Sequence, residues 1–337
     1  MKIAVDAMGG DFAPVEVIKG AVNGAKQYGV GLIFVGPEQV IQSELAKNDT
    51  KGLDIEIVHT DEYLVEGEHP AYAMRQKRKA SIMVATKLVR EGRAAAVVGF
   101  GPTGGVFAAA LQVLGTMEGL ARPVIGGNFL GFAPNTFVID LGGNVDSRPD
   151  QLLDFGIIGI VYARRWMKIN NPTLALLSNG LEEGKGNDVT KATFELMKKS
   201  GLNFIGNIEG NDIALGKANV VICDGFVGNC IIKFCEGLGR VTAGWLQENL
   251  KGKLPEAEVK DMVNSYIHST IIADTTGGGP LLGLNGIVCK GHGRSKAPEI
   301  AHTIGTAKQA VEMDLVGTTK AELTAIRAKI NIPDPNV

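Results

Sequence analysis

The stretch Val220-Val-Ile-Cys223-Asp-Gly-Phe-Val-Gly-Asn229 decides the fold of this chain. Its first four residues are apolar and mostly β-branched, which predicts a strand buried on both faces, as in a parallel sheet. Asp224 and the glycines after it predict a turn that leads into a helix. The stretch therefore predicts one strand–turn–helix unit of an α/β protein.

An apolar run that breaks into a Gly/Asn/Asp turn occurs seven times along the chain. Besides Asp224–Asn229, the turns are Asp6–Asp11, Gly99–Gly105, Asp140–Asp146, Gly180–Asn187, Gly206–Gly210 and Thr276–Pro280. Open α/β sheets bind ligands where their strands end, and glycine lets backbone N–H groups approach a ligand closely. A helix N-terminus adds roughly half a positive charge. The turns are therefore candidate anion sites, although any one of them alone is equally typical of an ordinary βα connection.

The composition is typical of one large α/β domain or of two smaller ones. The chain has 337 residues, including 45 glycines, and only 6% are aromatic. A net charge of −2 gives no support for nucleic-acid binding. The cysteines lack CxxC spacing and the chain begins with a strand pattern, so we expect a cytosolic protein with reduced thiols. No apolar run reaches the ~18–20 residues of a membrane span, so any membrane contact is expected to be peripheral.

Strands and helices are expected to alternate over most of the chain. The expected strands are 2–5, 31–35, 53–58, 94–98, 136–141, 174–177, 203–205 and 220–223, with a return to α/β structure over 276–288. The expected helices are 15–28, 38–46, one carrying Met74, Ile82, Val84 and Leu88, then 106–114, 151–166, 188–199, 228–238, 298–315 and a short one near 319–330.

A helical arm is expected at about 238–275, where no strand pattern occurs. Its second half has an apolar stripe with i, i+3, i+4, i+7 spacing, formed by Val259, Met262, Val263, Tyr266, Ile267 and Ile271. We therefore predict a single α/β/α domain over residues 1–337 that contains this inserted arm.

The segment Gly99-Phe-Gly-Pro-Thr-Gly104 matches GxGxxG between an expected strand and helix. A dinucleotide fingerprint also requires an acidic residue at the end of a second strand about 20 residues on, and this region offers only Glu118. Pro102 is expected at the first position of a helix. We interpret the loop as a cradle for a phosphate or a thioester oxyanion, with nicotinamide binding as the alternative.

Two further loops carry cationic or titratable side chains. Lys185 stands between glycines before a helix without the Walker order, so it is either an anion contact or a solvated turn lysine. His292 lies with Arg294 and Ser295 in a Gly-flanked loop after a strand, a candidate contact for an anion or an acyl group.

Carboxylates stand at several expected strand ends, namely Asp6, Asp11, Asp140, Asp146 and Asp224. They are placed either to hold a metal or to cap helices, and capping is the commoner role. No cluster has zinc-ligand spacing, so no metal is predicted. A GxSxG elbow is absent and no cysteine has an activating sequence context, which gives no support for a covalent enzyme intermediate.

Taken in order, these motifs resemble the phosphate acyltransferases of bacterial phospholipid synthesis, which convert acyl-acyl carrier protein and inorganic phosphate to acyl phosphate. The matching segments are Met1–Pro14, Gly184–Asn187, Gly206–Gly210, Cys223–Asn229, Pro280–Gly283 and His292–Ser295. The resemblance implies the three-layer α/β/α sandwich of the isocitrate/isopropylmalate dehydrogenases and phosphotransacetylases, with a mainly parallel sheet, as a homodimer that needs no cofactor.

Two loops depart from the family pattern. The usual Gly-Asn-Thr-Gly reads Gly101-Pro-Thr-Gly104, and Asn-Ile-Gly-Glu-Glu reads Ser178-Asn-Gly-Leu-Glu182. Two alternatives to acyl transfer therefore stay open. One is a nicotinamide-dependent decarboxylating dehydrogenase on the same fold, and the other is a non-catalytic scaffold of lipid synthesis.

The resemblance and the turns together predict the site. The residues expected to act in catalysis are Lys185, Asn187, Asn229 and His292, and those expected to bind phosphate or substrate are Asp6, Gly9, Gly10, Thr103, Gly104, Gly105, Asp224, Gly228 and Ser295. Phosphate is already anionic, and a thiol with a pKa near 8.5 leaves without strong acid assistance. Positioning two reactants and stabilising an oxyanion can then supply most of the rate enhancement.

The partners implied by the resemblance are acyl carrier protein and a membrane-bound glycerol-3-phosphate acyltransferase that uses the acyl phosphate. An acidic carrier requires a basic patch, for which Arg75–Lys79 is the densest run, followed by Arg164-Arg165 with Lys168. A cytoplasmic location with peripheral contact to the inner face of the cell membrane is expected. The arm offers Trp245, Leu246, Leu250, Lys251 and Lys253 for lipid contact, while the stripe on its second helix is expected mainly to pack against a second subunit.

Overall fold

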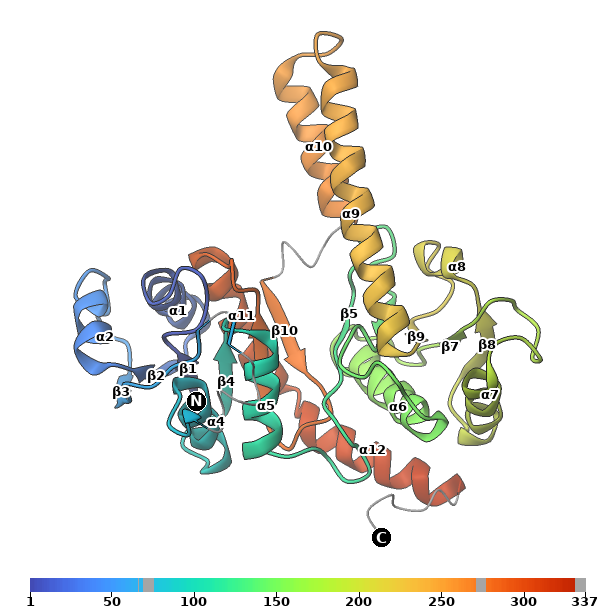
Figure 1. Ribbon diagram of the computed structural model, residues 1–337, viewed down its shortest axis with the longest axis horizontal. Helices are drawn as coiled ribbons and strands as arrows, with labels where there is room; N and C mark the ends of the chain where they lie inside the picture. The colour runs from blue at the N-terminus through green and yellow to red at the C-terminus, as the bar shows by residue number, and fades with distance from the viewer. Residues whose placement is uncertain (66, 69–75, 271–276, 331–337) are drawn as a thin grey trace. The chain divides into compact units, whose positions relative to one another are not determined.

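The computed structural model describes residues 1–65, 67–68, 76–270 and 277–330. The predicted positions Met74, Arg75 and Ile271 lie outside these residues. The chain forms two compact units. The first unit contains Met1–Pro123 and Thr276–Gly317, and the second unit contains Val124–Thr275 and Thr318–Val337. Each unit has its own sheet (Figure 1) and is described by itself. The expectation of a single domain over 1–337 stays a prediction.

The sheet of the first unit has six strands in the order β10-β11-β4-β1-β2-β3, all parallel to their neighbours except β10. Their bounds are β1 (Lys2–Asp6), β2 (Gly31–Gly36), β3 (Ile55–His59), β4 (Ala96–Gly99), β10 (Gly278–Leu281) and β11 (Ile287–Gly291). The helices are α1 (Val15–Tyr28), α2 (Glu38–Leu45), α4 (Ser81–Arg90), α5 (Thr103–Val113) and α11 (Ala297–Glu312).

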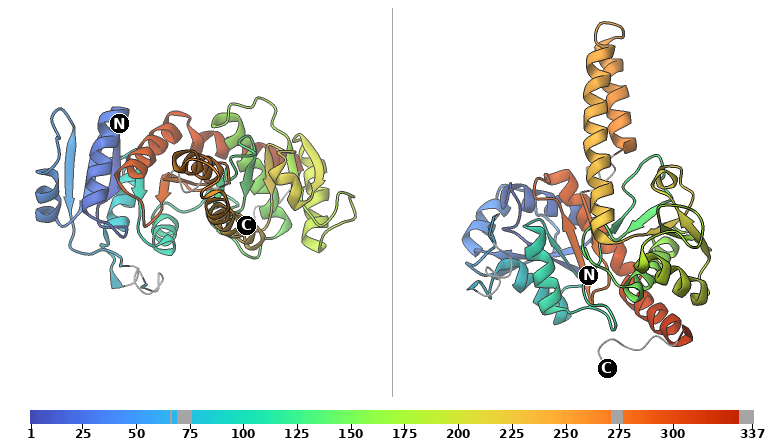
Figure 2. Two further views of the ribbon diagram at one scale, coloured as in Figure 1. Left: turned by 90° about the horizontal axis from the view of Figure 1, so that it is seen from above. Right: turned by 45° about the vertical axis from the view of Figure 1, so that its right-hand side comes forward.

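Helices cover both faces of this sheet. The crossovers β1–α1–β2 and β3–α4–β4 run in opposite directions, and right-handed crossovers then place α1 and α4 on opposite faces. Helix α1 packs against α11, and α4 packs against α5 (Figures 1 and 2). The contact between α1 and α11 is close, because a Cβ atom at Gly20 would lie 2.6 Å from the Cβ of Ile300.

The sheet of the second unit has five strands in the order β5-β6-β9-β7-β8. Their bounds are β5 (Gly126–Gly127), β6 (Phe137–Ile139), β7 (Leu174–Leu177), β8 (Phe204–Ile208) and β9 (Val220–Ile222). The helices are α6 (Pro149–Arg165), α7 (Asp188–Ser200), α8 (Gly210–Ala214), α9 (Gly225–Leu250), α10 (Glu256–Thr270) and, from Thr318 on, α12 (Leu315–Ile330). Helices α6 and α7 pack together on one face, and the return crossover through α8 covers the other.

Strand β9 lies between β6 and β7 and pairs in parallel with both. All three of its residues are fully buried, as the apolar run Val220–Ile222 predicts. The predicted α/β class with mainly parallel strands is confirmed. One expected turn is different, because Gly278–Leu281 of the Thr276–Pro280 segment forms strand β10, antiparallel to β11.

The arm begins earlier than the sequence predicts. The helix expected to end near Leu238 continues without a break to Leu250, so α9 crosses both Gly237 and Gly244. A Cβ atom at either glycine would meet no other atom within 4 Å, so neither glycine serves a close contact. The prediction of a helix end there was wrong because apolar residues continue along α9 at helical spacing.

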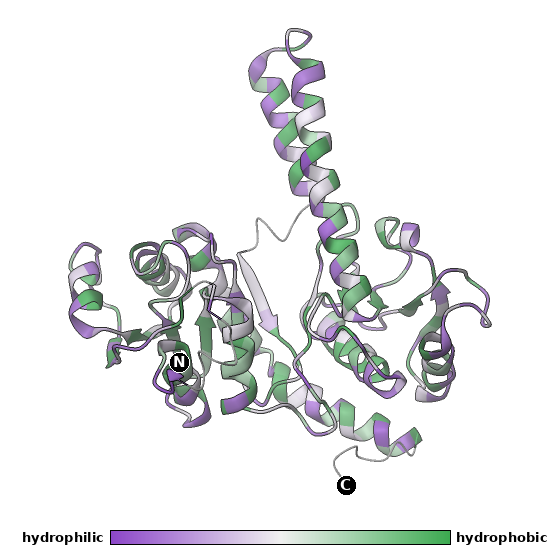
Figure 3. Ribbon diagram, viewed as in Figure 1, coloured by the Kyte–Doolittle hydropathy of each residue, from purple (hydrophilic) through white to green (hydrophobic). Residues whose placement is uncertain are grey.

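Helix α10 packs along α9 and uses its apolar stripe in doing so (Figure 3). Val259 and Val263 are buried with Ala243 of α9, and the partly buried residues packed around them are Leu246, Leu250, Tyr266 and Ile267. The expectation that this stripe packs mainly against a second subunit is therefore corrected. Met262 is the described member of the stripe that stays exposed on α10, and α9 exposes Phe234, Leu238, Val241 and Trp245, which follow 4-3-4 spacing.

None of the helices in the described part of the chain is long and apolar enough to cross a membrane.

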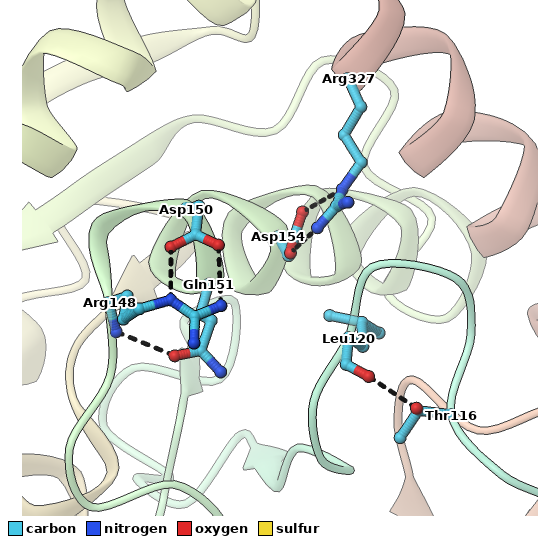
Figure 4. A network of polar contacts seen from close by, with 7 residues as sticks. All are labelled: Thr116, Leu120, Arg148, Asp150, Gln151, Asp154 and Arg327. Atoms are coloured by element: carbon cyan, nitrogen blue, oxygen red, sulfur yellow. Dashed lines mark hydrogen bonds and ion pairs between the residues drawn. The ribbon is translucent and has the colours of Figure 1, made fainter. Parts of the chain in front are cut away.

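A buried ion pair fastens α12 to α6 within the second unit. The guanidinium of Arg327 donates to both carboxylate oxygens of Asp154, at 2.9 Å and 2.5 Å (Figure 4). Asp154 is fully buried and Arg327 is 9% exposed. The same two helices also carry an exposed pair, Arg164 with Glu322, at 3.1 Å.

Replacing Arg327 with Ala is expected to lower the free energy of unfolding by about 3–5 kcal/mol, because the buried Asp154 charge is left without a partner. Removing the exposed partner with Glu322→Ala is expected to cost no more than about 1 kcal/mol. Urea unfolding of the three proteins measures both losses. Equal losses in the two variants would contradict the structural role assigned to the buried pair.

Candidate functional site

The predicted site residues fall into two sets, one on each unit. The first unit holds Asp6, Gly9, Gly10, Thr103, Gly104, Gly105, His292 and Ser295. The second unit holds Lys185, Asn187, Asp224, Gly228 and Asn229.

In the first unit, three loops meet at the carboxyl ends of β1, β4 and β11, which are neighbours in the sheet. A Cβ atom at Gly9 would lie 2.7 Å from the backbone nitrogen of Gly101, so only glycine fits between these two loops. Gly10 has a φ of 115°, which favours glycine. The N–H of Asp11 donates to the carbonyl of Gly293 at 2.8 Å. The sheet thus brings the turns after β1, β4 and β11 into direct contact.

Asp6 supports this loop cluster from inside and is 3% exposed. Its Oδ1 accepts hydrogen bonds from the Ser81 hydroxyl at 2.6 Å and from the Met8 N–H at 3.3 Å. Burial raises the pKa of Asp6 from 3.8 to about 6, and the hydrogen bonds from Ser81, Met8 and Gly9 oppose that rise. The carboxylate therefore acts on the shape of the Gly9–Gly10 turn rather than at its surface.

Helix α5 begins in the same cluster, at Thr103. Pro102 is its N-cap residue, one position before the place that the sequence predicts. Thr103 and Gly104 are exposed, and neither N–H donates a hydrogen bond to any described residue. The N–H of Gly105 already donates to the carbonyl of Pro102 at 2.9 Å, so the first two residues of the helix are the ones open to an anion.

Of the two predicted side chains in the loop after β11, one is exposed to solvent and the other is buried. His292 is exposed, and its backbone N–H donates to the carbonyl of Gly277 at 3.3 Å. Ser295 is 7% exposed, and its N–H donates to the carbonyl of His292 at 3.0 Å. The loop is therefore a compact turn directly before α11.

The second unit has a cavity of about 300 Å³ at the carboxyl ends of β6, β7 and β9. It is formed by the ends of these strands and the first turns of α6, α7 and α9. The lining residues are Val145, Asp146, Ser147, Leu152, Leu176, Leu177, Asn187, Val189, Thr190, Cys223, Asp224, Phe226 and Val227. The structure thus brings two predicted residues, Asn187 and Asp224, to one cavity.

The hydrogen-bond acceptors of two key lining side chains are already occupied. Asp224 caps α9, and its carboxylate accepts from the N–H groups of Phe226 at 2.8 Å and Ser147 at 2.9 Å. Asn187 caps α7, and its Oδ1 accepts from the N–H and the hydroxyl of Thr190 at 2.8 Å and 2.9 Å. The capping role weighed for Asp224 is therefore the one that the structure shows.

The donors of the same lining are open. The Asn187 side-chain N–H₂ and the backbone N–H groups of Val189 and Val227 donate to no described residue. First-turn N–H groups point out of a helix N-terminus, and the helix dipole favours negative charge there. The exposed Asp146 adds one carboxylate to the lining. Apart from Asp146, the arrangement fits a ligand that accepts hydrogen bonds, such as a phosphate or a carbonyl group.

Lys185 lies two residues before Asn187, in the loop between β7 and α7. Its side chain is exposed and forms no ion pair with any described residue. The loop itself is held in place, because the Gly186 N–H donates to the Asn179 side chain at 2.8 Å and the Asn207 side chain donates to the Glu182 carbonyl at 2.9 Å. The ammonium group of Lys185 is therefore available to an anion at the start of α7.

Two predicted residues of α9 lie beside the cavity lining rather than in it. A Cβ atom at Gly228 would lie 1.9 Å from the carbonyl oxygen of Asp140, so this glycine allows close packing of α9. Its N–H donates to the carbonyl of Asp224 within the helix. Asn229 is exposed and borders Gly142.

The buried cysteines are poor nucleophiles. Burial raises the pKa of the Cys289 thiol to about 12, and burial near the Asp140 and Asp224 carboxylates raises the pKa of the Cys223 thiol well above its usual range. These two thiols are therefore protonated at neutral pH.

Sequence reasoning missed the donors that support the predicted carboxylates, namely the Ser81 hydroxyl and the Ser147 backbone N–H. Ser81 lies 75 positions from Asp6, and Ser147 lies 77 positions from Asp224, so no local motif joins them. Thr190 had a usable signal, because it follows the capping Asn187 by three residues.

Comparison with known proteins identifies a matching family and similar relatives. A model of the fatty acid synthesis protein family matches residues 1–317. The phosphate acyltransferase of Pelotomaculum thermopropionicum is 42% identical over 333 residues, which cover 98% of this chain and 97% of that protein. The phosphate acyltransferase of Desulforamulus reducens is 42% identical over 328 residues, which cover 96% and 97%.

Among solved structures, a phosphotransacetylase from Streptococcus pyogenes matches with a TM-score of 0.65 over 93% of this chain and 94% of that chain. The two sequences are 20% identical, so this similarity concerns the fold. It confirms the fold class that the motifs imply.

Asp6 is expected to make stability depend on pH. A carboxyl group whose pKa is higher in the folded protein stabilises the fold below its unfolded pKa and loses that contribution as the pH rises through the folded value. Relative to Asp6→Asn, the wild type should therefore lose up to about 3 kcal/mol of unfolding free energy between pH ~4 and ~6. Ser81→Ala removes a hydrogen bond to the ionised form and should extend this loss to higher pH. Parallel pH profiles for wild type and Asp6→Asn would refute the assignment.

Proposed function

This chain belongs to the fatty acid synthesis protein family, that of the phosphate acyltransferases, and from that premise we propose that it transfers a fatty acyl group from acyl carrier protein to inorganic phosphate. The family and the enzyme class identified from the motifs are thereby confirmed. Membership in this family also favours acyl transfer over the dehydrogenase and scaffold alternatives.

The proposed reaction joins a phosphate oxygen to the thioester carbonyl carbon. The carbon–sulfur bond breaks, and the proton of hydrogen phosphate goes to the carrier thiolate, which leaves as a thiol. The products are an acyl phosphate and the free carrier. No covalent enzyme intermediate is needed, in agreement with the raised pKa values of the buried thiols.

The observation that carries the proposal is the surplus of open donors at the cavity of the second unit. The Asn187 Oδ1 and the Asp224 carboxylate already accept hydrogen bonds from backbone N–H groups, while the Asn187 side-chain N–H₂ and other first-turn N–H groups are left to bind an anion. We assign phosphate to this end of the cavity, with Lys185 neutralising part of its charge. Donors fixed by helix ends need little reorganisation as charge moves from phosphate to the thioester oxygen.

The loop cluster of the first unit is proposed as a second place for an acceptor group of the substrates. Its open donors are the N–H groups of Thr103 and Gly104, beside the exposed His292 loop. The Asn that Pro102 replaces would stand at the N-cap of α5, which here has no side-chain cap. Pro102→Asn is therefore the substitution that restores the family pattern at this helix end.

Docking of the carrier is proposed on the basic runs of the sequence. Lys77 pairs with Glu68 at 2.6 Å, and Arg164 pairs with Glu322, so neither charge is wholly available to a partner. Arg78 and Lys79 are exposed and form no ion pair with described residues. These two cations are the stronger candidates for contact with an acidic carrier.

A homodimer is proposed through the exposed face of α9. The exposed face has the 4-3-4 spacing of a coiled-coil seam, formed by Phe234, Leu238, Val241 and Trp245, and α10 covers other residues of the helix.

The tip of the arm is proposed to contact an anionic membrane at the cytoplasmic face. It carries the charged residues Lys251 and Lys253, followed by the exposed Leu254 just before α10 begins. Such peripheral contact would pass the acyl phosphate to a membrane-bound glycerol-3-phosphate acyltransferase.

Replacing Lys185 with Ala is expected to lower kcat/KM for phosphate about tenfold to a hundredfold, because one charge-assisted contact is lost. Release of carrier thiol from acyl carrier protein, followed at varied phosphate concentration, measures the effect. Lys199→Ala, at the far end of α7, is the matched control and should leave the rate unchanged. Equal phosphate dependence in wild type and Lys185→Ala would remove Lys185 from the site, and thiol release that needs no phosphate would overturn the proposed function.

The double variant Leu238→Glu with Val241→Glu is expected to convert the dimer to a monomer, because it places charges in the proposed seam. Light scattering coupled to size exclusion measures the mass. Met262→Glu, an equally accessible position on α10, should keep the dimer, and Leu254→Glu should keep the dimer while losing sedimentation with anionic vesicles. A double variant that stays dimeric would place the interface elsewhere.

A further inference from the structure

The mouth of the cavity in the second unit is apolar and exposed. Val145 is 61% exposed and Phe226 is 62% exposed, and both belong to the lining. They come from different elements, since Val145 lies in the loop after β6 and Phe226 lies in the first turn of α9. Large apolar side chains that are held in water beside a cavity are typical of a ligand-binding surface.

The inner wall of the same cavity is also apolar. Leu152 and Leu176 are almost fully buried and line it together with Leu177. The open donors of Asn187, Val189 and Val227 belong to this lining as well. The cavity therefore fits a ligand that has an accepting head group and an apolar chain.

The volume of the cavity limits how much of such a chain it can enclose. The cavity measures about 300 Å³, which is the lower end of the range for ligand pockets, and it is open to solvent. Phosphate and the thioester carbon take part of that space. The remainder of a long acyl chain must then leave the cavity across its mouth, where Val145 and Phe226 lie.

The proposed dimer seam does not account for these two residues. Val145 is not on α9, and Phe226 falls outside the spacing that joins Phe234, Leu238 and Val241. Val227 lies seven residues before Phe234 and continues that seam, so it does not distinguish the two roles. The proposed dimer seam therefore does not cover the exposed side chains of Phe226 and Val145.

We propose that Phe226 and Val145 contact the acyl chain of the substrate where it leaves the cavity, and that they set the preference for chain length. This inference rests on the proposed acyl transfer. When methylene groups of the acyl chain cover the Phe226 ring, apolar surface of the ring and of the chain is removed from water. A long chain reaches the ring and gains this binding energy, whereas a short chain does not. Neither side chain is expected to take part in the transfer step.

The test compares palmitoyl and butyryl thioesters of the carrier in wild type and Phe226→Ala. The variant is expected to lower kcat/KM for the palmitoyl donor about tenfold and to change the butyryl value by less than about twofold. Val145→Ala should shift the ratio in the same direction by a smaller factor. Phe132→Ala removes an equally exposed ring of the same unit outside the cavity lining, and it should change neither value.

The outcomes that count against the proposal are distinguishable from the outcome that counts against its premise. An equal loss with both donors in Phe226→Ala overturns the chain contact alone, as does an equal change in Phe132→Ala. If wild type transfers neither acyl group, the proposed function fails, and chain binding is judged by titration with hexadecyl phosphate. Phe226→Ala must then weaken that binding about tenfold, and unchanged binding overturns the inference.

Discussion

The candidate site of the second unit depends on the buried carboxylate of Asp140. This side chain accepts hydrogen bonds from the backbone N–H groups of Ile125, Gly142, Gly143 and Asn144 and from the Asn144 amide. Burial raises its pKa, and the hydrogen bonds from Gly143, Asn144 and Ile125 oppose that rise. The carbonyl of Asn144 in turn accepts from Gly225 at 2.8 Å, which ties the loop after β6 to the first residue of α9. One buried charge therefore fixes both segments that supply most of the cavity mouth.

The open donors of the cavity, on which the proposed anion site rests, follow from helix capping. Each cap uses a side-chain acceptor to satisfy one first-turn N–H, and the other first-turn N–H groups are left open. Because α6, α7 and α9 follow strands that end side by side, their starts gather at one edge of the sheet. Donors gathered at such an edge support the proposed phosphate site, which suits a reaction whose nucleophile is already charged.

The local elements were predictable from sequence because their signals are local. Continuous apolar runs located β9 and β7, and the turn residues located the start of α7, whereas α9 begins at Gly225, three residues before the expected Gly228. The end of α9 was not predictable from its glycines, since a Cβ atom at Gly237 or Gly244 would meet no atom within 4 Å and each glycine costs only modest helix stability. The partner of the α10 stripe was also missed, because periodicity shows which face is apolar but not what covers it. For the site, sequence placed Asp224 at a strand end and Asn187 just before a helix, but it could not show that Asp6 is buried on Ser81, a contact that only the fold creates.

In the proposed reaction, phosphate itself attacks the thioester carbon. Incubating the protein with acyl carrier protein and phosphate labelled with ¹⁸O at every oxygen, and weighing the product by mass spectrometry, tests it directly. Direct attack by phosphate yields an acyl phosphate that retains all four labelled oxygens, formed together with free carrier thiol. Release of unlabelled fatty acid without any acyl phosphate would mean that water is the nucleophile and would contradict the account.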